Sequence, residues 1–460
     1  MMPLRTFAIL STLFLAAAVA RAEDAAAGWV LTTADFRSAE VTLKSIDASG
    51  VHVAGDANQP GSDRVVGMDE FLQLERPMPA SVAAAQQGKF VLHLAGGDEV
   101  AGEPASVRGE QLVWNNAAAG EVRVPMSRAV AITRPGQSAP DRRPAEDVVT
   151  LANGDAVRGI IAGIEGGKIS VQRTDSPDPL AVPVDSVASV QFAATGAGGA
   201  AAGAASGKRA FRLRLGDGSS LPAATLTLAA GKLSADLGDG KPRPFDLSRV
   251  AAIEQVNGPA SWLTDRQPAE NVYLPYFGTG QDFPARMNLS GDGGRDLRFG
   301  GKSFRRGIAV HAYSRLVYPL DGQFAALRLQ YAVDERMARA DMTVRVKLDD
   351  KVVHEKQAVR GGTLSPVIFA DLGGAKRLTL EVDYGGGTDV QDRLVWLEPA
   401  LLRHKPAAEP PATPPPAATP ATPPQPAGAQ PSQPAATPPA TTPSPSPASN
   451  PAKAAGDVGR

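Results

Sequence analysis

The chain has 460 residues, 43% of them apolar, which is enough material for several hydrophobic cores rather than one. Its 47 basic and 48 acidic side chains give a formal net charge of −1, so composition excludes the basic surface that nucleic acid or an anionic membrane requires. The absence of cysteine excludes disulfides, thiolate metal sites and cysteine nucleophiles. Neutral partners are therefore favoured, and stability must come from burial.

The first 22 residues have the pattern of a signal peptide. Arg5 precedes an apolar run from Phe7 to Ala20, and Ala20-Arg21-Ala22 fits an A-x-A cleavage site. The run is shorter than the roughly 20 residues of a spanning helix, and an uncleaved anchor is the alternative. We expect an exported protein, located in the periplasm, the cell envelope or outside the cell, with no membrane span in the mature chain.

Residues 28 to 256 repeat one pattern four times. A closing element starts at Met68, Met126, Val184 and Leu247. Each copy begins with an apolar residue, then Asp or Ser, then any residue, then a second apolar residue. It ends on an apolar residue six places after its first. Successive copies begin 58, 58 and 63 residues apart, which indicates an internal duplication. We name the predicted units repeats 1 to 4, at residues 28–76, 88–134, 147–192 and 209–256.

Each repeat opens with an alternating strand that leads into a tight turn, and glycine supplies the positive φ that such turns require. The turns in repeats 2 to 4 are Gly97-Asp98, Asn153-Gly154-Asp155 and Gly216-Asp217-Gly218. Repeat 1 matches least, because it has Thr32-Thr33-Ala34-Asp35 instead. The order of strands and turns resembles the Sm-like small barrel, with Asp185 and Ser248 expected to cap a short turn before the last strand. The Ala-, Gly- and Ser-rich linker at 193–207 leaves open whether the repeats pack together.

The segment from Trp262 to Leu402 resembles the NPCBM family of bacterial carbohydrate-binding modules. Its matching motifs occur in the family's order: Trp262–Asp265, Leu297–Gly307, Ile308–Ala312, Leu327–Glu335, Met342–Asp350, Ala375–Val382 and Asp392–Trp396. Independently of the family, Val344 and Val346 alternate with Arg345 and Lys347, as in a strand with one buried face. The expected fold class is all-β, with tandem small Sm-like barrels, an antiparallel jelly-roll-like sandwich at 261–403, and a disordered Pro- and Ala-rich tail at 404–460.

The resemblance implies a glycan ligand, and the candidate binding residues are His311, Asp392, Arg393 and Trp396. Sugar recognition needs an aromatic plate and fixed hydrogen-bonding groups. Each candidate has a structural alternative: Trp396 in the core, His311 buried and hydrogen-bonded, and Asp392 with Arg393 as an ion pair across a loop. The chain departs from the family where a histidine and a second aspartate are common, since it has Arg393 and Val395, and this removes a carboxylate.

Paired acids at Asp334 and Glu335 are weak metal candidates, with a turn or cap as the alternative. A structural calcium ion is left open and no other cofactor is expected.

Catalysis has little support in the sequence. The five histidines are scattered without an HExxH pair, no Gly-x-Ser-x-Gly elbow occurs, and no unassigned segment is large enough for a glycoside hydrolase domain. We predict an exported, non-catalytic protein that binds a glycan or glycoconjugate through its C-terminal module. The repeats would act as spacers or contact envelope proteins. The alternative is an envelope structural or assembly protein whose sandwich binds protein and has lost sugar binding.

Overall fold

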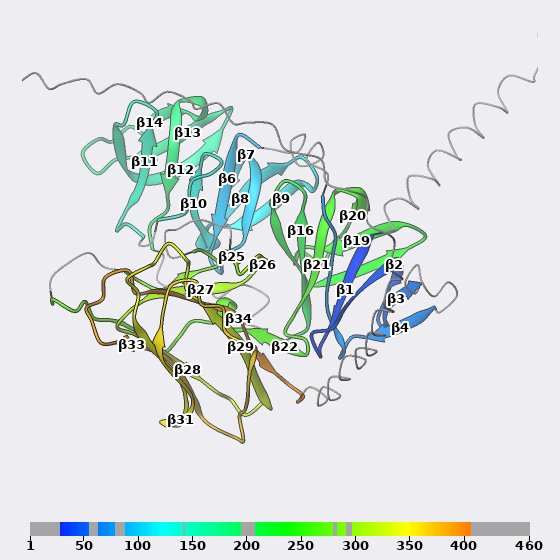
Figure 1. The fold of residues 1–460 in the computed structure, drawn as a ribbon. Coiled ribbons are helices and arrows are strands. Elements are labelled where there is room, and N and C mark those ends of the chain that lie inside the picture. The colour runs from blue at the N-terminus through cyan, green and yellow to red at the C-terminus, as the bar shows by residue number, and fades with distance from the viewer. Residues whose placement is uncertain are drawn as a thin grey trace, which may run out of the picture. The chain divides into compact units, whose positions relative to one another are not determined.

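The computed structural model describes residues 28–54, 63–78, 88–140, 143–194, 208–278, 283–290 and 297–405. Within these ranges every regular element is a β-strand or a short 3-10 turn, so the all-β prediction is confirmed (Figure 1). The predicted signal peptide and almost all of the Pro-rich tail lie outside the described residues.

The four repeats have closely similar strand contents. Repeat 1 contains β1 (Trp29–Thr33), β2 (Ser38–Ile46), β3 (Gly50–Ala54), β4 (Arg64–Gly67) and β5 (Phe71–Glu75). Repeat 2 contains β6 (Phe90–Leu94), β7 (Glu99–Arg108), β8 (Gln111–Asn116), β9 (Gly120–Pro125), η1 (Met126–Arg128) and β10 (Ala129–Thr133). Repeat 3 contains β11 (Asp147–Leu151), β12 (Ala156–Glu165), β13 (Lys168–Gln172), β14 (Leu180–Pro183), η2 (Val184–Ser186) and β15 (Val187–Gln191). Repeat 4 contains β16 (Ala210–Leu215), β17 (Ser220–Ala223), β18 (Thr225–Ala229), β19 (Lys232–Asp236), β20 (Pro242–Phe245), η3 (Leu247–Arg249) and β21 (Val250–Val256).

Each repeat is an antiparallel meander whose last strand pairs back onto its first. In repeat 2 the order is β10-β6-β7-β8-β9, and repeat 4 differs only in that its second strand is split into β17 and β18. The Sm-like assignment stays an interpretation of this order. The predicted caps were wrong, because Asp246 caps η3 by accepting a hydrogen bond from the Ser248 backbone N–H at 2.9 Å, and η2 has no side-chain cap.

The turn after the first strand is the same in all four repeats. Its backbone hydrogen bonds recur as Leu94 N–H to Asp98 O in repeat 2 and Thr33 N–H to Arg37 O in repeat 1. Glycine holds the left-handed position in repeats 2 to 4, with φ between 82° and 91°, whereas in repeat 1 Phe36 holds it at φ 61°. A bulky residue is rarely found in this region, so the turn of repeat 1 is strained.

The repeats join in nested pairs through their last strands. Strand β5 pairs with β21, with Leu74 opposite Ile253, and β10 pairs with β15, with Ile132 opposite Val190. These four residues occupy the same position of the closing element, so repeats 1 and 4, and likewise repeats 2 and 3, are related by a local twofold.

An arginine two residues further on crosses each of these seams. Arg76 donates to the Val250 carbonyl at 3.0 Å, and Arg134 donates to the Val187 carbonyl at 2.7 Å. Val250 and Val187 are equivalent positions in their repeats, so the two seams use the same contact.

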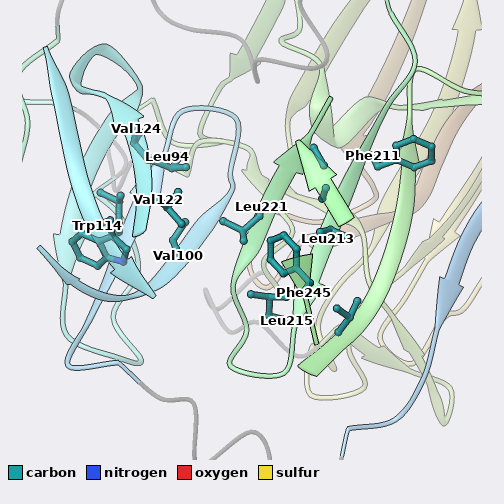
Figure 2. Close-up of a cluster of buried hydrophobic side chains, with 14 of the residues drawn as sticks. Leu94, Val100, Trp114, Val122, Val124, Phe211, Leu213, Leu215, Leu221 and Phe245 are labelled. Carbon is teal, nitrogen blue, oxygen red and sulfur yellow. The ribbon is translucent and has the colours of Figure 1, made fainter. Parts of the chain in front are cut away.

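A single buried apolar cluster runs through the four repeats. Figure 2 shows part of it, with Trp114 inside repeat 2 and Leu221 of β17 directed toward Val100 of β7. Polar contacts accompany this packing, since Asn116 Nδ2 donates to Asp217 at 2.8 Å. The repeats therefore pack together, which the sequence left open.

Residues 261–403 form two facing antiparallel sheets. The first sheet contains β24 (Arg286–Met287), β27 (Gly307–His311), β34 (Arg393–Leu402), β29 (Ala326–Ala332) and β32 (Ile368–Asp371), with β22 (Ala260–Trp262) also paired to β34. The second contains β23 (Glu270–Tyr273), β28 (Ser314–Pro319), β33 (Arg377–Tyr384), β30 (Met342–Leu348) and β31 (Lys351–Val359). The turn η4 (Leu263–Asp265) and the hairpin β25 (Leu297–Phe299) with β26 (Lys302–Phe304) complete this part.

The two sheets differ in how their outer faces are covered. On β30 and β33 apolar residues face the core between the sheets, while Arg345 and Lys347 lie on the other face, as the alternation predicted. The strand β34 of the first sheet is buried on both faces. Its outer residues Val395 and Leu397 pack under the β25–β26 hairpin, and Ala400 and Leu402 pack with Leu72 of repeat 1.

Candidate functional site

His311 and Arg393 lie side by side at one end of the first sheet. His311 ends β27, Arg393 begins β34, and the two residues are cross-strand partners. Phe283 joins them, because the His311 ring stacks on it with centroids 4.7 Å apart, and the Arg393 guanidinium lies 5.5 Å from its centroid. Tyr273 meets the His311 ring edge-on at 5.9 Å. Two of the four predicted residues thus line one shallow hollow with an aromatic wall.

Burial disfavours the charged form of His311. Loss of solvent around the ring lowers the pKa of His311, although its contact with the Ala312 carbonyl and the charge of Asp389 act in the opposite direction. Nδ1 lies 3.0 Å from that carbonyl oxygen, which sets it as the N–H donor. The burial and the hydrogen bond of this ring match the predicted alternative, a buried and hydrogen-bonded histidine.

Asp392 lies beneath the loops of the same end and is completely buried. Its Oδ1 accepts a hydrogen bond from the Asp341 backbone N–H at 2.9 Å, and its own carbonyl accepts one from Ala312 N–H at 3.0 Å. Burial, with the like charges of Asp341 and Asp389, raises the pKa of Asp392 to about 6. Asp392 therefore fixes loops and cannot touch a ligand, which corrects its place among the contact residues. The structure also shows no ion pair between Asp392 and Arg393.

The prediction that Trp396 is an aromatic plate for a sugar was wrong. Its side chain is 0% exposed and packs edge-on against Tyr331, with centroids 6.0 Å apart, inside the core between the sheets. A ring without a free face cannot stack on a sugar, so the core alternative holds.

Asp334, one of the two weak metal candidates, is paired with an arginine. Asp334 is bound by Arg336, whose Nη2 lies 2.7 Å from Oδ2. Among the described residues no group of three or more histidine and acidic side chains could hold a metal ion. Asp334 also accepts a hydrogen bond from the Arg336 backbone N–H at 2.8 Å, as in the turn that was the predicted alternative.

A cluster of aromatic rings, of which Tyr276 and Phe277 are exposed, lies beside His311 and Arg393, and the motif comparison did not identify it. Four of the six tyrosines of the chain, together with Phe277 and Phe283, gather at this end: Tyr273, Tyr276, Tyr313 and Tyr384. Phe277 is 68% exposed and Leu274 is 55% exposed. We call residues 273–277, Phe283, His311, Tyr313, Tyr384 and Arg393 the aromatic end.

Hydrogen bonds hold these rings in place. The Tyr276 backbone N–H donates to Asp389 at 3.0 Å, and the Tyr384 hydroxyl donates to the Leu274 carbonyl. Tyr276 meets Tyr384 edge-on at 5.1 Å and Phe277 at 5.0 Å. The exposed ring faces are therefore largely preformed, with carboxylates and a guanidinium within the same loops.

One sequence signal could have found this cluster. Pro275-Tyr276-Phe277-Gly278 places two aromatic residues in a loop bounded by proline and glycine, where no core exists to bury them. Tyr384 gives no such signal, because its neighbours predict only the end of a strand.

The aromatic end has the chemistry of a binding site. Its exposed rings supply contact area, and a buried histidine, Arg393 and Asp389 supply hydrogen-bonding groups. Within the described residues at this end, no nucleophile, base and orienting group are aligned. The described part of the chain also contains no helix long and apolar enough to cross a membrane.

Comparison with known proteins identifies the sandwich. The family model described as NPCBM/NEW2 domain matches residues 261–402, and no curated protein matches the chain. A solved CBM51 module of Clostridium perfringens GH95, in complex with methyl-galactose, is 24% identical, with 31% of this chain and 99% of that chain covered and a TM-score of 0.27.

Two further solved structures are similar. CBM51-2 with the INT domains of Clostridium perfringens ZmpB, in complex with GlcNAc, is 17% identical over 39% of this chain and 37% of that chain, with a TM-score of 0.27. The tandem CBM51 modules of Sp3GH98 from Streptococcus pneumoniae SP3-BS71 are 12% identical over 81% of this chain and 87% of that chain, also with a TM-score of 0.27. Scores this low establish nothing about the ligand of this chain. The family match agrees with the motifs from Trp262 to Trp396, and residues 261–402 form an NPCBM/NEW2 domain.

Proposed function

We propose that this is an exported, non-catalytic protein that binds a glycan or glycoconjugate at the aromatic end of its NPCBM/NEW2 domain. The observation that carries the proposal is the exposure of Tyr276 and Phe277, 47% and 68%, on a loop fixed by Asp389 and Tyr384. Sugar rings pack their C–H faces on such side chains, and a preformed site spares the cost of ordering it.

The polar groups of the aromatic end suit a hydroxylated ligand. Arg393 beside Phe283 offers donors, and Asp389 offers an acceptor next to the Tyr276 ring. In this proposal His311, Phe283 and Arg393 form one wall, and Tyr276 and Phe277 form the plate that Trp396 cannot provide.

The alternative proposal is an assembly protein whose domain binds protein, and one observation favours it. Val395, where the family often has an aspartate, is buried beneath the β25–β26 hairpin, so this position contributes no carboxylate to a ligand. Exposed Leu274, Phe277 and Val390 would equally suit an apolar protein partner.

A glycan array probed with the full chain separates the two proposals. We expect a defined set of glycans to bind, and the double variant Tyr276→Ala, Phe277→Ala to weaken the strongest hit about 10-fold or more, because each lost ring contact is worth about 0.5–1.5 kcal/mol. Phe369→Ala is the matched control, since Phe369 is a 52% exposed aromatic residue on β32, outside the aromatic end. A folded protein without any glycan signal would exclude sugar binding and leave the assembly role.

A further inference from the structure

Five charged side chains are buried together where the domain meets the repeats. We call Asp98, Arg212, Glu254, Asp265 and Arg306 the junction cluster. Arg306 of the domain donates to Glu254 of repeat 4 at 2.6 Å and to its own Asp265 at 2.9 Å. Arg212 of repeat 4 donates to Asp98 of repeat 2 at 2.8 Å and to Asp265 at 3.2 Å. The cluster thus joins two repeats and the domain in one chain of ion pairs.

Such a cluster is stable only while it is complete. Burial opposes the ionised form of Glu254, but Arg214, Arg306 and Arg212 outweigh it and hold the pKa of Glu254 well below its usual range. Burial likewise opposes ionisation of Asp265, and Arg306 and Arg212 lower the pKa of Asp265. Removing one partner from a buried pair leaves a charge without solvent or counterion, which costs several kcal/mol. The charges are therefore matched only when every partner is in place, which fixes how the domain meets the repeats.

An apolar seam lies beside the cluster. Leu72 of repeat 1 packs with Ala326, Ala400 and Leu402 on the outer face of the first sheet. The outer face of a sandwich sheet is ordinarily solvated and polar, so small and apolar residues at these positions indicate a permanently covered surface.

Phe36 supplies an independent observation. The other three repeats have glycine at the equivalent left-handed position, and only repeat 1 carries a bulky residue there, at φ 61°. Its ring meets Trp262 edge-on, with centroids 6.1 Å apart, and lies 4.0 Å beneath the Arg328 guanidinium. Both contacts belong to the segment 261–403. A strained side chain that touches the domain is explained by docking rather than by the fold of repeat 1.

We infer that the face of the NPCBM/NEW2 domain formed by Trp262, Asp265, Arg306, Arg328 and Leu402 is a docking surface for the paired repeats 1 and 4. The domain and the repeats accordingly unfold as one cooperative unit. Strand β34 runs from Arg393 at the aromatic end to Leu402 at the docking surface, roughly 30 Å away at about 3.3 Å per residue. Docking therefore leaves the aromatic end uncovered, and the repeats serve as a rigid base rather than a flexible spacer. This inference does not depend on which ligand the aromatic end takes.

The four tryptophans allow the inference to be tested in the full chain. Trp29 reports on repeat 1, Trp114 on repeat 2, Trp262 on the docking surface and Trp396 on the core of the domain. We would label the protein with 5-fluorotryptophan, assign the four ¹⁹F signals with single Trp→Phe variants, and follow each through a urea titration. The expected result is one shared midpoint. Separate midpoints for Trp29 and Trp396 would overturn the inference.

Phe36→Gly makes the test specific, because it gives repeat 1 the residue that the other repeats carry. If docking couples the two parts, the variant shifts the ¹⁹F signal of Trp262 and lowers the midpoint of Trp396 by at least roughly 0.5 M urea. An unmoved Trp396 midpoint contradicts docking, since strain relief alone acts only on repeat 1. Glu270→Gln is the control: it breaks an exposed pair with Arg315 on the other sheet and should leave all midpoints in place.

Discussion

The two ends of the NPCBM/NEW2 domain use the same residue types in opposite ways. At the docking surface, Arg306 is 3% exposed, and its guanidinium is neutralised by two carboxylates and lies 4.9 Å from the Trp262 ring. At the aromatic end, Arg393 lies against Phe283 while Tyr276 and Phe277 remain in solvent. The first end is saturated with contacts inside the chain, and the second keeps ring faces free. Both ends contain arginine and aromatic residues. The proposed binding surface differs from the docking surface because its Tyr276 and Phe277 rings are exposed to solvent.

The largest effect is expected for Trp396→Ala, which lies between the two ends. Removing a completely buried indole leaves a cavity in the core, and we expect the free energy of unfolding to fall by about 3–5 kcal/mol. Urea denaturation at 25 °C measures this change. Phe369→Ala removes an exposed ring and should change stability by less than about 0.5 kcal/mol. A stable Trp396→Ala protein that has lost glycan binding would instead place the indole within reach of a ligand.

The docking surface is probed next by Glu254→Gln. The neutral side chain leaves Arg214 and Arg306 without their shared carboxylate, so we expect a loss of about 3 kcal/mol at pH 7. Because the folded-state pKa of Glu254 is depressed, its stabilisation is present above the ordinary carboxyl pKa of about 4.5 and is lost as pH falls below it.

The wild type and the Glu254→Gln variant should therefore converge in stability as the pH is lowered from 7 to about 3, as measured by urea titrations at both values. An equal difference at the two pH values would mean that shape, and not charge, makes position 254 important.

A smaller effect is expected at the aromatic end from Tyr384→Phe. The change keeps the ring that contacts Tyr276 and deletes only the hydroxyl that donates to the Leu274 carbonyl. We expect a loss of about 1 kcal/mol in glycan affinity, roughly 5-fold in Kd, because the loop that carries Tyr276 loses one anchor. Isothermal titration with the strongest array hit measures it. Unchanged affinity would show that the edge-on ring contact alone fixes the loop.

The sequence predicted local patterns well and long-range contacts poorly. Alternation in Val344-Arg345-Val346 and the spacing of the closing elements predicted strands and repeats, because both depend on neighbours along the chain. The nested pairing of Leu74 with Ile253 was not predictable, since four similar last strands offer several partners that local propensity cannot rank.

The site shows the same limit. Motif order predicted that His311 and Arg393 lie together, and they do. The exposure of a ring depends on what packs over it, and Trp396 in an apolar strand has the same sequence neighbours whether its face is free or covered. The junction cluster was also missed. In the sequence Glu254 and Arg306 look like ordinary surface residues, because their burial comes from contacts between positions about fifty residues apart.

An effect of similar size, confined to neutral and higher pH, concerns Asp392, which ties the loops of the aromatic end together. The amide of Asp392→Asn keeps an oxygen that accepts from the Asp341 N–H but cannot ionise. Burial, with Asp341 and Asp389 nearby, raises the folded-state pKa to about 6, so the wild type is most stable below the ordinary pKa of about 4 and loses this contribution as pH rises through 6.

We therefore expect Asp392→Asn to be more stable than the wild type by roughly 1 kcal/mol at pH 7.5 and equal to it at pH 4, in urea titrations of both proteins. The sign decides what the carboxyl group does at this end. A variant less stable than the wild type at pH 7.5 would mean that a counter-charge holds Asp392 ionised in the folded protein.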